Sequence, residues 1–149
     1  MTSPARRRIS GIGLVLVAVY AIMALAASGR SFVQIVQRFD EAPVAYSLSA
    51  VSAAVYVLAT LALVFAGSRR WFVVASVAIV FELVGVLVVG TLSLLMPAVF
   101  QHPTVWSVYG YGYLFIPLVL PFVGLWWLRS HPPIAATIAA TPDATGARR

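Results

Sequence analysis

Residues 71–96 form a long apolar run and read WFVVASVAIVFELVGVLVVGTLSLLM. It contains one charged residue, Glu82, and no proline. A helix needs about 20 predominantly apolar residues to cross a hydrocarbon layer of ~30 Å. We therefore predict a membrane-spanning helix over this stretch.

Three similar apolar runs occupy residues 9–28, 44–66 and 108–128. The chain is 62% hydrophobic and 9% charged, whereas a soluble domain is about 25% charged. Its 149 residues accommodate four spans and short loops but no second folded domain. The fold class predicted is therefore all-α: a polytopic membrane protein, an antiparallel bundle of four transmembrane helices within residues 9–129.

The arginines predict the orientation of this bundle. All ten basic residues are arginine, and with four spans eight of them fall on one side. Basic residues are retained on the cytoplasmic side during insertion. We therefore predict a multi-pass protein of the plasma membrane with both termini cytoplasmic. The residues that carry this topology signal within or beside the bundle are Arg6, Arg7, Arg8, Arg69, Arg70 and Arg129.

The first apolar run has an alternative interpretation. The basic residues 6–8 and the small residues around Ala24 and Ala26 are also typical of a cleaved signal peptide. We favour an uncleaved span, because the apolar stretch is long for a signal peptide. An even number of spans also returns Arg129 to the cytoplasmic side.

The segments outside the spans are short. Residues 1–8 are predicted to be a basic cytoplasmic tail. Residues 130–149 are rich in alanine, threonine and proline, and we expect a disordered cytoplasmic tail because they supply few large apolar side chains. In residues 30–43, large apolar side chains recur at helical spacing, which indicates either a short amphipathic surface helix or a continuation of the first helix.

Two features describe the later spans. The connection at residues 67–70 is so short that the second and third spans must form an antiparallel hairpin. Pro117 and Pro121 lie in the fourth run and predict a kink near its centre. Aromatic residues favour the membrane interface, so Trp106 and Tyr109 are expected in an aromatic belt at the outer surface.

Glu82 is the ionisable side chain placed within a span, where a charge costs roughly 2.5–3.5 kcal/mol. It lies on one helical stripe with small residues, which indicates a face that packs against other helices. Counting back from the hairpin turn places Tyr56 level with Glu82, and Tyr20 lies at the centre of the first span. We therefore predict a buried polar cluster of Glu82, Tyr56 and Tyr20 near Pro117. The stripe consists of Ala75, Ala78, Glu82 and Gly85.

Two functions follow from Glu82. It is either a proton or cation site, or a structural residue that makes an interhelical hydrogen bond. Neither cysteines nor a catalytic set of residues is present, and His102 and His131 fall on opposite sides of the membrane. We expect no enzyme activity, no metal, no cofactor and no nucleic-acid partner. The expected partners are the lipid bilayer and a membrane protein or a second copy of the chain.

The last third of the chain contains TVWS at 104–107, YGYGY at 109–113, PLVLP at 117–121 and GLW at 124–126. With these motifs it resembles a group of small four-span integral membrane proteins of actinobacteria that have no assigned activity. The resemblance implies a location in the plasma membrane. Small multidrug-resistance transporters also have four short spans and one membrane-embedded glutamate. Their glutamate is in the first helix, whereas Glu82 is in the third, so the likeness remains an analogy.

Overall fold

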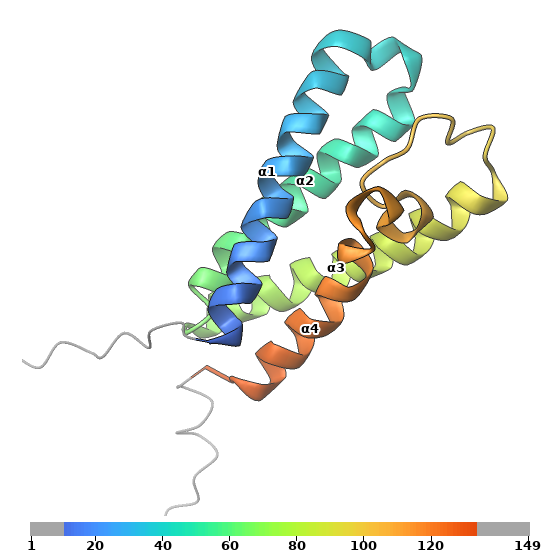
Figure 1. Ribbon diagram of the computed structural model, residues 1–149. Helices are drawn as coiled ribbons and strands as arrows, with labels where there is room; N and C mark the ends of the chain where they lie inside the picture. The colour runs from blue at the N-terminus through green and yellow to red at the C-terminus, as the bar shows by residue number, and fades with distance from the viewer. Residues whose placement is uncertain (1–10, 134–149) are drawn as a thin grey trace, which may run out of the picture.

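A computed structural model describes residues 11–133, and this part of the chain is all-helical (Figure 1). The predictions for residues 1–8, for Arg6, Arg7 and Arg8, and for the tail beyond residue 133 lie outside the described residues. In chain order the elements are α1 (Ile12–Arg38), η1 (Phe39–Glu41), α2 (Pro43–Val64), α3 (Arg69–Leu95), η2 (Ser107–Tyr113) and α4 (Ile116–Ser130). The predicted all-α bundle is confirmed.

Helix α1 is longer than the first apolar run. It continues without a break to Arg38, so residues 30–38 extend the first helix and do not form a separate surface helix. No proline interrupts this stretch, and Gly29 has open space around it. A helix of 27 residues is ~40 Å long. The short 3-10 turn η1 then reverses the chain, and Pro43 begins α2 at a position where its missing N–H costs nothing.

Helices α2 and α3 form the predicted hairpin. The Oγ of Ser68 accepts a hydrogen bond from the backbone N–H of Trp71 at 3.5 Å and so caps the start of α3. Because only residues 65–68 separate the helices, α3 must return along α2. This hairpin brings the middle of α2 level with the middle of α3.

The sequence predicts a fourth span over residues 108–128 with a kink near its centre, and the structure divides this segment into two helices. Residues 108–113 belong to the 3-10 segment η2, and α4 begins only at Ile116 after a bend of 97°. At 15 residues, α4 is about 22 Å long. Three described helices are long and apolar enough to cross a membrane, and the bent pair of η2 and α4 brings the number to four if it counts as one span.

The break does not lie where the prolines predicted it. Leu114 and Phe115 have left-handed backbone conformations, and they make the bend. Pro117 stands in the first turn of α4, where its missing N–H is tolerated. Pro121 lies inside α4, where it leaves the carbonyl of Pro117 without the usual helical hydrogen bond. Pro117 therefore marks the start of α4, and Pro121 lies within it.

The helices pack in chain order (Figure 1). Helix α1 lies along α2, α3 lies along α2, and α4 lies along one half of α3. The start of α1, the α2–α3 turn and the end of α4 lie together at one end of the bundle. The turn η1 and the loop that follows α3 lie at the other end, with η2 folded back against α3.

Alanines are frequent on the buried faces, and many large apolar side chains are exposed. Ala27, Ala59 and Ala75 are fully buried, whereas Leu25 is 76% exposed. Membrane helices approach closely through small residues because lipid removes the hydrophobic drive for association. A bundle with large apolar side chains directed outward is therefore suited to a lipid surround.

Candidate buried polar site

Glu82 faces the interior of the bundle. It is on α3, its side chain is 0% exposed, and Ala75 and Ala78 on the same stripe are also buried. Gly85, the fourth member of the stripe, is covered by an aromatic ring. The stripe therefore faces the bundle interior, as the sequence predicts.

Tyr20 bonds directly to Glu82. Its hydroxyl donates a hydrogen bond of 2.8 Å to Oε2 of Glu82, which joins α1 to α3. Helix α4 covers this pair with Gly124, because a Cβ at Gly124 would lie 3.4 Å from the Tyr20 hydroxyl. A glycine here therefore lets α4 approach the hydrogen bond closely.

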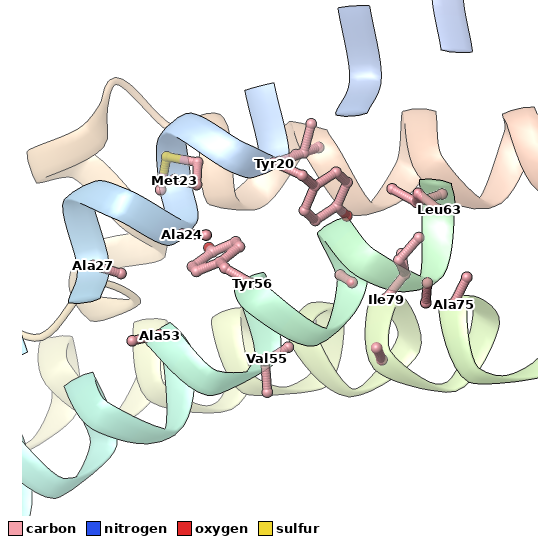
Figure 2. Close-up of a cluster of buried hydrophobic side chains, with 14 of the residues drawn as sticks. Tyr20, Met23, Ala24, Ala27, Ala53, Val55, Tyr56, Leu63, Ala75 and Ile79 are labelled. Atoms are coloured by element: carbon pink, nitrogen blue, oxygen red, sulfur yellow. The ribbon is translucent and has the colours of Figure 1, made fainter. Parts of the chain in front are cut away.

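Tyr56 of α2 completes the predicted set of three. Its side chain is 0% exposed, and its ring centroid lies 6.2 Å from that of Tyr20. Figure 2 shows the two rings between α1 and α2, with alanines of both helices beside them. The structure therefore brings together Glu82, Tyr56 and Tyr20 from three helices.

Trp106 is the site residue that the sequence analysis missed. It was predicted in an outer aromatic belt, and that prediction is wrong: its side chain is only 2% exposed. A Cβ at Gly85 would lie 2.6 Å from the indole ring, so the ring rests directly on the backbone of α3. The ring also meets Phe81 edge-on, with centroids 6.3 Å apart. Gly85 lies in a stripe that faces the bundle interior, and a glycine at such a position leaves room for an aromatic ring. This glycine was the feature of the sequence that could have indicated the burial of Trp106.

Hydrogen bonds fix the loop between α3 and η2, which contains Trp106. The Oγ of Ser107 accepts from the backbone N–H of Thr104 at 2.8 Å, and the Oγ of Ser93 on α3 accepts from Val108 N–H at 2.8 Å. At the outer edge, Nη2 of Arg30 donates to the carbonyl of Pro103 at 2.6 Å. Helices α1 and α3 thus both anchor the segment around Trp106.

The backbone beyond Trp106 is strained. Val108 and Tyr109 have φ values of 50° and 58°, a region that β-branched and bulky residues rarely adopt. The Tyr109 ring packs on Gly90, and its hydroxyl shares a hydrogen bond of 3.0 Å with Oγ1 of Thr91. Gly110 (φ 80°) fits closely against the ring of Pro117. Such conformations persist where surrounding contacts determine them, and these contacts keep η2 against α3.

The remaining predicted residues lie at the ends of the bundle. Arg69 and Arg70 begin α3, and Arg129 lies in the last turn of α4. His102 lies in the loop that follows α3 and meets the ring of Tyr46 with centroids 5.7 Å apart, whereas His131 follows the last residue of α4. Among residues 11–133, no group of three or more histidine, aspartate or glutamate side chains is arranged to hold a metal ion.

The cluster contains polar atoms without partners. Within the described part of the chain, Oε1 of Glu82, the hydroxyl of Tyr56 and Nε1 of Trp106 are buried and make no hydrogen bond. Buried polar atoms are nearly always paired, and an unpaired one costs about 1–3 kcal/mol. One oxygen of the Glu82 carboxyl is thus bonded to Tyr20, and the other makes no hydrogen bond within residues 11–133.

Comparison of the chain with protein-family models, with curated proteins and with solved structures finds no match.

Proposed function

We propose that this chain is a multi-pass protein of the plasma membrane with a structural or accessory role, assembled with a membrane-protein partner or with another copy of itself, and that it is not an enzyme. The observation that carries the proposal is the hydrogen bond from Tyr20 to Oε2 of Glu82. It uses the membrane-embedded carboxyl to join helices inside a closed bundle.

The packing around this bond supports a structural role. Lipid supplies no hydrophobic drive for helix association, so close packing and interhelical hydrogen bonds hold such bundles together. Glu82, Tyr20 and Tyr56 are each 0% exposed and come from three different helices. A polar group at the centre of an otherwise apolar bundle also disfavours alternative helix registers, because any slip would leave it unpaired in hydrocarbon.

The positions of the arginines support the proposed orientation. Arg69, Arg70 and Arg129 lie at the bundle end where α1 begins. At the opposite end, Arg30 and Arg38 are accompanied by the acidic residues of η1. We propose that the arginine-rich end is cytoplasmic, because basic residues close to spans stay on that side.

A proton-coupled transporter or channel that uses Glu82 is the second candidate. The specific observation in its favour is Oε1 of Glu82, which is buried and makes no hydrogen bond within residues 11–133. An intramembrane carboxyl with a free oxygen is typical of a site that exchanges a proton. In this candidate, Tyr20 would hold the carboxyl in place and Tyr56 would pass the proton.

A measurement of proton flux in proteoliposomes distinguishes the structural role from proton coupling. The purified chain is reconstituted around a pH-sensitive dye, a pH gradient is imposed, and its decay is compared between the wild type and Glu82→Gln. The structural proposal expects equal decay. Faster decay in the wild type than in a folded Glu82→Gln protein would replace it with proton coupling. Glu41→Gln, which removes a carboxyl in the exposed turn η1, is the matched control.

The accessory role itself needs a positive result. The chain is extracted from its native membrane in a mild detergent, and the mass of the complex is measured by native mass spectrometry. We expect a defined mass larger than that of one chain of 16.0 kDa. A complex that contains one chain and lipid alone contradicts the proposed assembly.

A further inference from the structure

Helices α1 and α4 come close together at two glycines. The indole ring of Trp127 lies on Gly13, where an added Cβ would be 2.6 Å from the ring. A Cβ on Gly124 would lie 3.4 Å from the Tyr20 hydroxyl. Beside these contacts, branched aliphatic side chains hold the two helices apart and leave a groove of about 230 Å³. The groove is lined by Ile12, Val15, Leu16, Val19, Ile116, Val119, Leu120 and Val123.

The groove has a buried floor and exposed rims. Leu16 and Leu120 are buried and form the floor, whereas Val15 on α1 and Val119 on α4 are exposed and form the rims. The groove therefore opens on the outside of the bundle. It begins at Ile12, the first residue of α1, and so starts at the arginine-rich end. From there it runs lengthwise between the two helices.

We propose that this groove binds one acyl chain of a phospholipid from the leaflet at the arginine-rich end. All eight lining side chains are aliphatic, so they offer an occupant dispersion contacts and no hydrogen bond. Cationic side chains near a membrane surface attract anionic lipid headgroups, and Arg129 lies in the last turn of α4. The proposal rests on the membrane location in the proposed function and is independent of the role of Glu82.

A partner helix is too large for this groove. A helix with its side chains is about 10–12 Å wide and rises 5.4 Å per turn, so one turn occupies roughly 500 Å³. The groove holds less than half of that volume. Membrane helices also approach one another through small residues, and none of the eight lining residues is glycine or alanine. A chain of methylene groups is thin and flexible enough to reach the floor.

The aromatic pair of Trp127 and His131 marks the end of the groove where the headgroup lies. Trp127 is one helical turn beyond Val123 on α4, and its ring stacks on that of His131 with centroids 5.0 Å apart. Tryptophan favours the depth of the headgroups. The acyl chain therefore enters beside Trp127 and extends past Val123 toward Ile116.

Nuclear magnetic resonance of methyl groups tests the groove. A protein with 13C-labelled isoleucine, leucine and valine methyls is placed in micelles of fully deuterated detergent. Phosphatidylglycerol with protonated chains is then added at one molecule per protein. We expect nuclear Overhauser effects from the lipid chain to Val15 and Val119 to be several-fold stronger than those to Val84 and Val88, which are exposed on α3. Effects at the groove that are absent, or equal to those on α3, overturn the proposal.

A variant with a filled groove gives a second test. Val119→Phe places a ring at the rim, and Val84→Phe is the matched control because the two valines are 56% and 53% exposed. In native mass spectrometry we expect one phosphatidylglycerol retained per chain by the wild type and Val84→Phe, and its loss from Val119→Phe. Equal retention by both variants overturns the proposal. If Val119→Phe does not fold, the methyl measurement on the wild type decides.

Mixed labelling tests for a second copy of the chain as the occupant. Two differently labelled preparations are combined, and Overhauser effects between copies at Val15 or Val119 would assign the groove to a second chain and overturn the proposal. The proton flux at Glu82 is measured separately, so a failure of the lipid site leaves the proposed role of that residue standing.

Discussion

The indole ring of Trp106 lies against the α-carbon of Gly85, so closely that a Cβ at this position would be 2.6 Å from the ring. The two residues are distant in sequence, and one belongs to a loop while the other lies on a membrane-length helix. This contact brings the loop after α3 into the bundle and next to the Glu82 cluster.

Gly85→Ala should destabilise the bundle by about 1–3 kcal/mol, because the added methyl group displaces the Trp106 ring and overpacking has costs of this size. Thermal unfolding in detergent, followed by tryptophan fluorescence, measures the effect. Gly29→Ala is the control, since Gly29 is helical and has nothing within 4 Å. Equal stability of the wild type and Gly85→Ala would show that the ring does not rest on α3.

Tyr20→Phe should cost about 0.6 kcal/mol, and rarely more than about 2, because it removes one interhelical hydrogen bond in a membrane bundle. Glu82→Leu should cost more, because it also leaves the Tyr20 hydroxyl without a partner. Glu82→Gln keeps the shape and an acceptor and should be tolerated. These costs are measured as free energies of unfolding in bicelles.

A double-mutant cycle of Tyr20→Phe and Glu82→Leu tests whether the two residues act together. We expect the loss in the double variant to be smaller than the sum of the single losses. Tyr111→Phe is the matched control, since the Tyr111 side chain is 69% exposed. Additive losses would mean that the hydrogen bond of 2.8 Å contributes nothing to stability.

Arg30→Gln should loosen the loop that carries Trp106, because Arg30 donates to the carbonyl of Pro103. A single cysteine introduced by Thr104→Cys reports on this loop, since Thr104 is only 5% exposed and the chain has no cysteine of its own. We expect thiol labelling at this position to be several-fold faster with Arg30→Gln. Arg38→Gln, at the end of the same helix, is the control. An unchanged rate would show that other contacts hold the loop.

The same cysteine-free background tests the proposed orientation. In intact cells, a membrane-impermeant thiol reagent should label His102→Cys and should not label Ser68→Cys. In permeabilised cells, the reagent should label both cysteine variants. Labelling of Ser68→Cys from outside would reverse the orientation, and the arginines at that end would then be extracellular.

Much of the site could be predicted from local features of the sequence. The helical period directs Ala75, Ala78 and Glu82 to the same face of α3, and a polar group in that stripe has reason to face other helices. The short connection at residues 65–68 leaves one way to pair α2 with α3. Tyr56 therefore has to lie level with Glu82, and both side chains are fully buried.

The path of the fourth segment could not be predicted in this way. Its apolar composition over residues 108–128 is that of a continuous span, yet Leu114 and Phe115 adopt left-handed conformations that break it. Hydropathy measures whether residues tolerate lipid, and it carries no information on backbone direction. The bend is stabilised by contacts with α3, such as that of Tyr109 with Gly90.

The amino-acid sequence is sufficient to predict the all-helical class, the hairpin of α2 and α3, and the inward direction of Glu82. Each of these depends on length, helical period or a short connection, which are local quantities. The folded chain was needed to establish the extension of α1, the break before α4 and the burial of Trp106. These depend on contacts between distant residues, such as Arg30 with Pro103, and the irregular loop after α3 has no periodicity from which such contacts can be inferred.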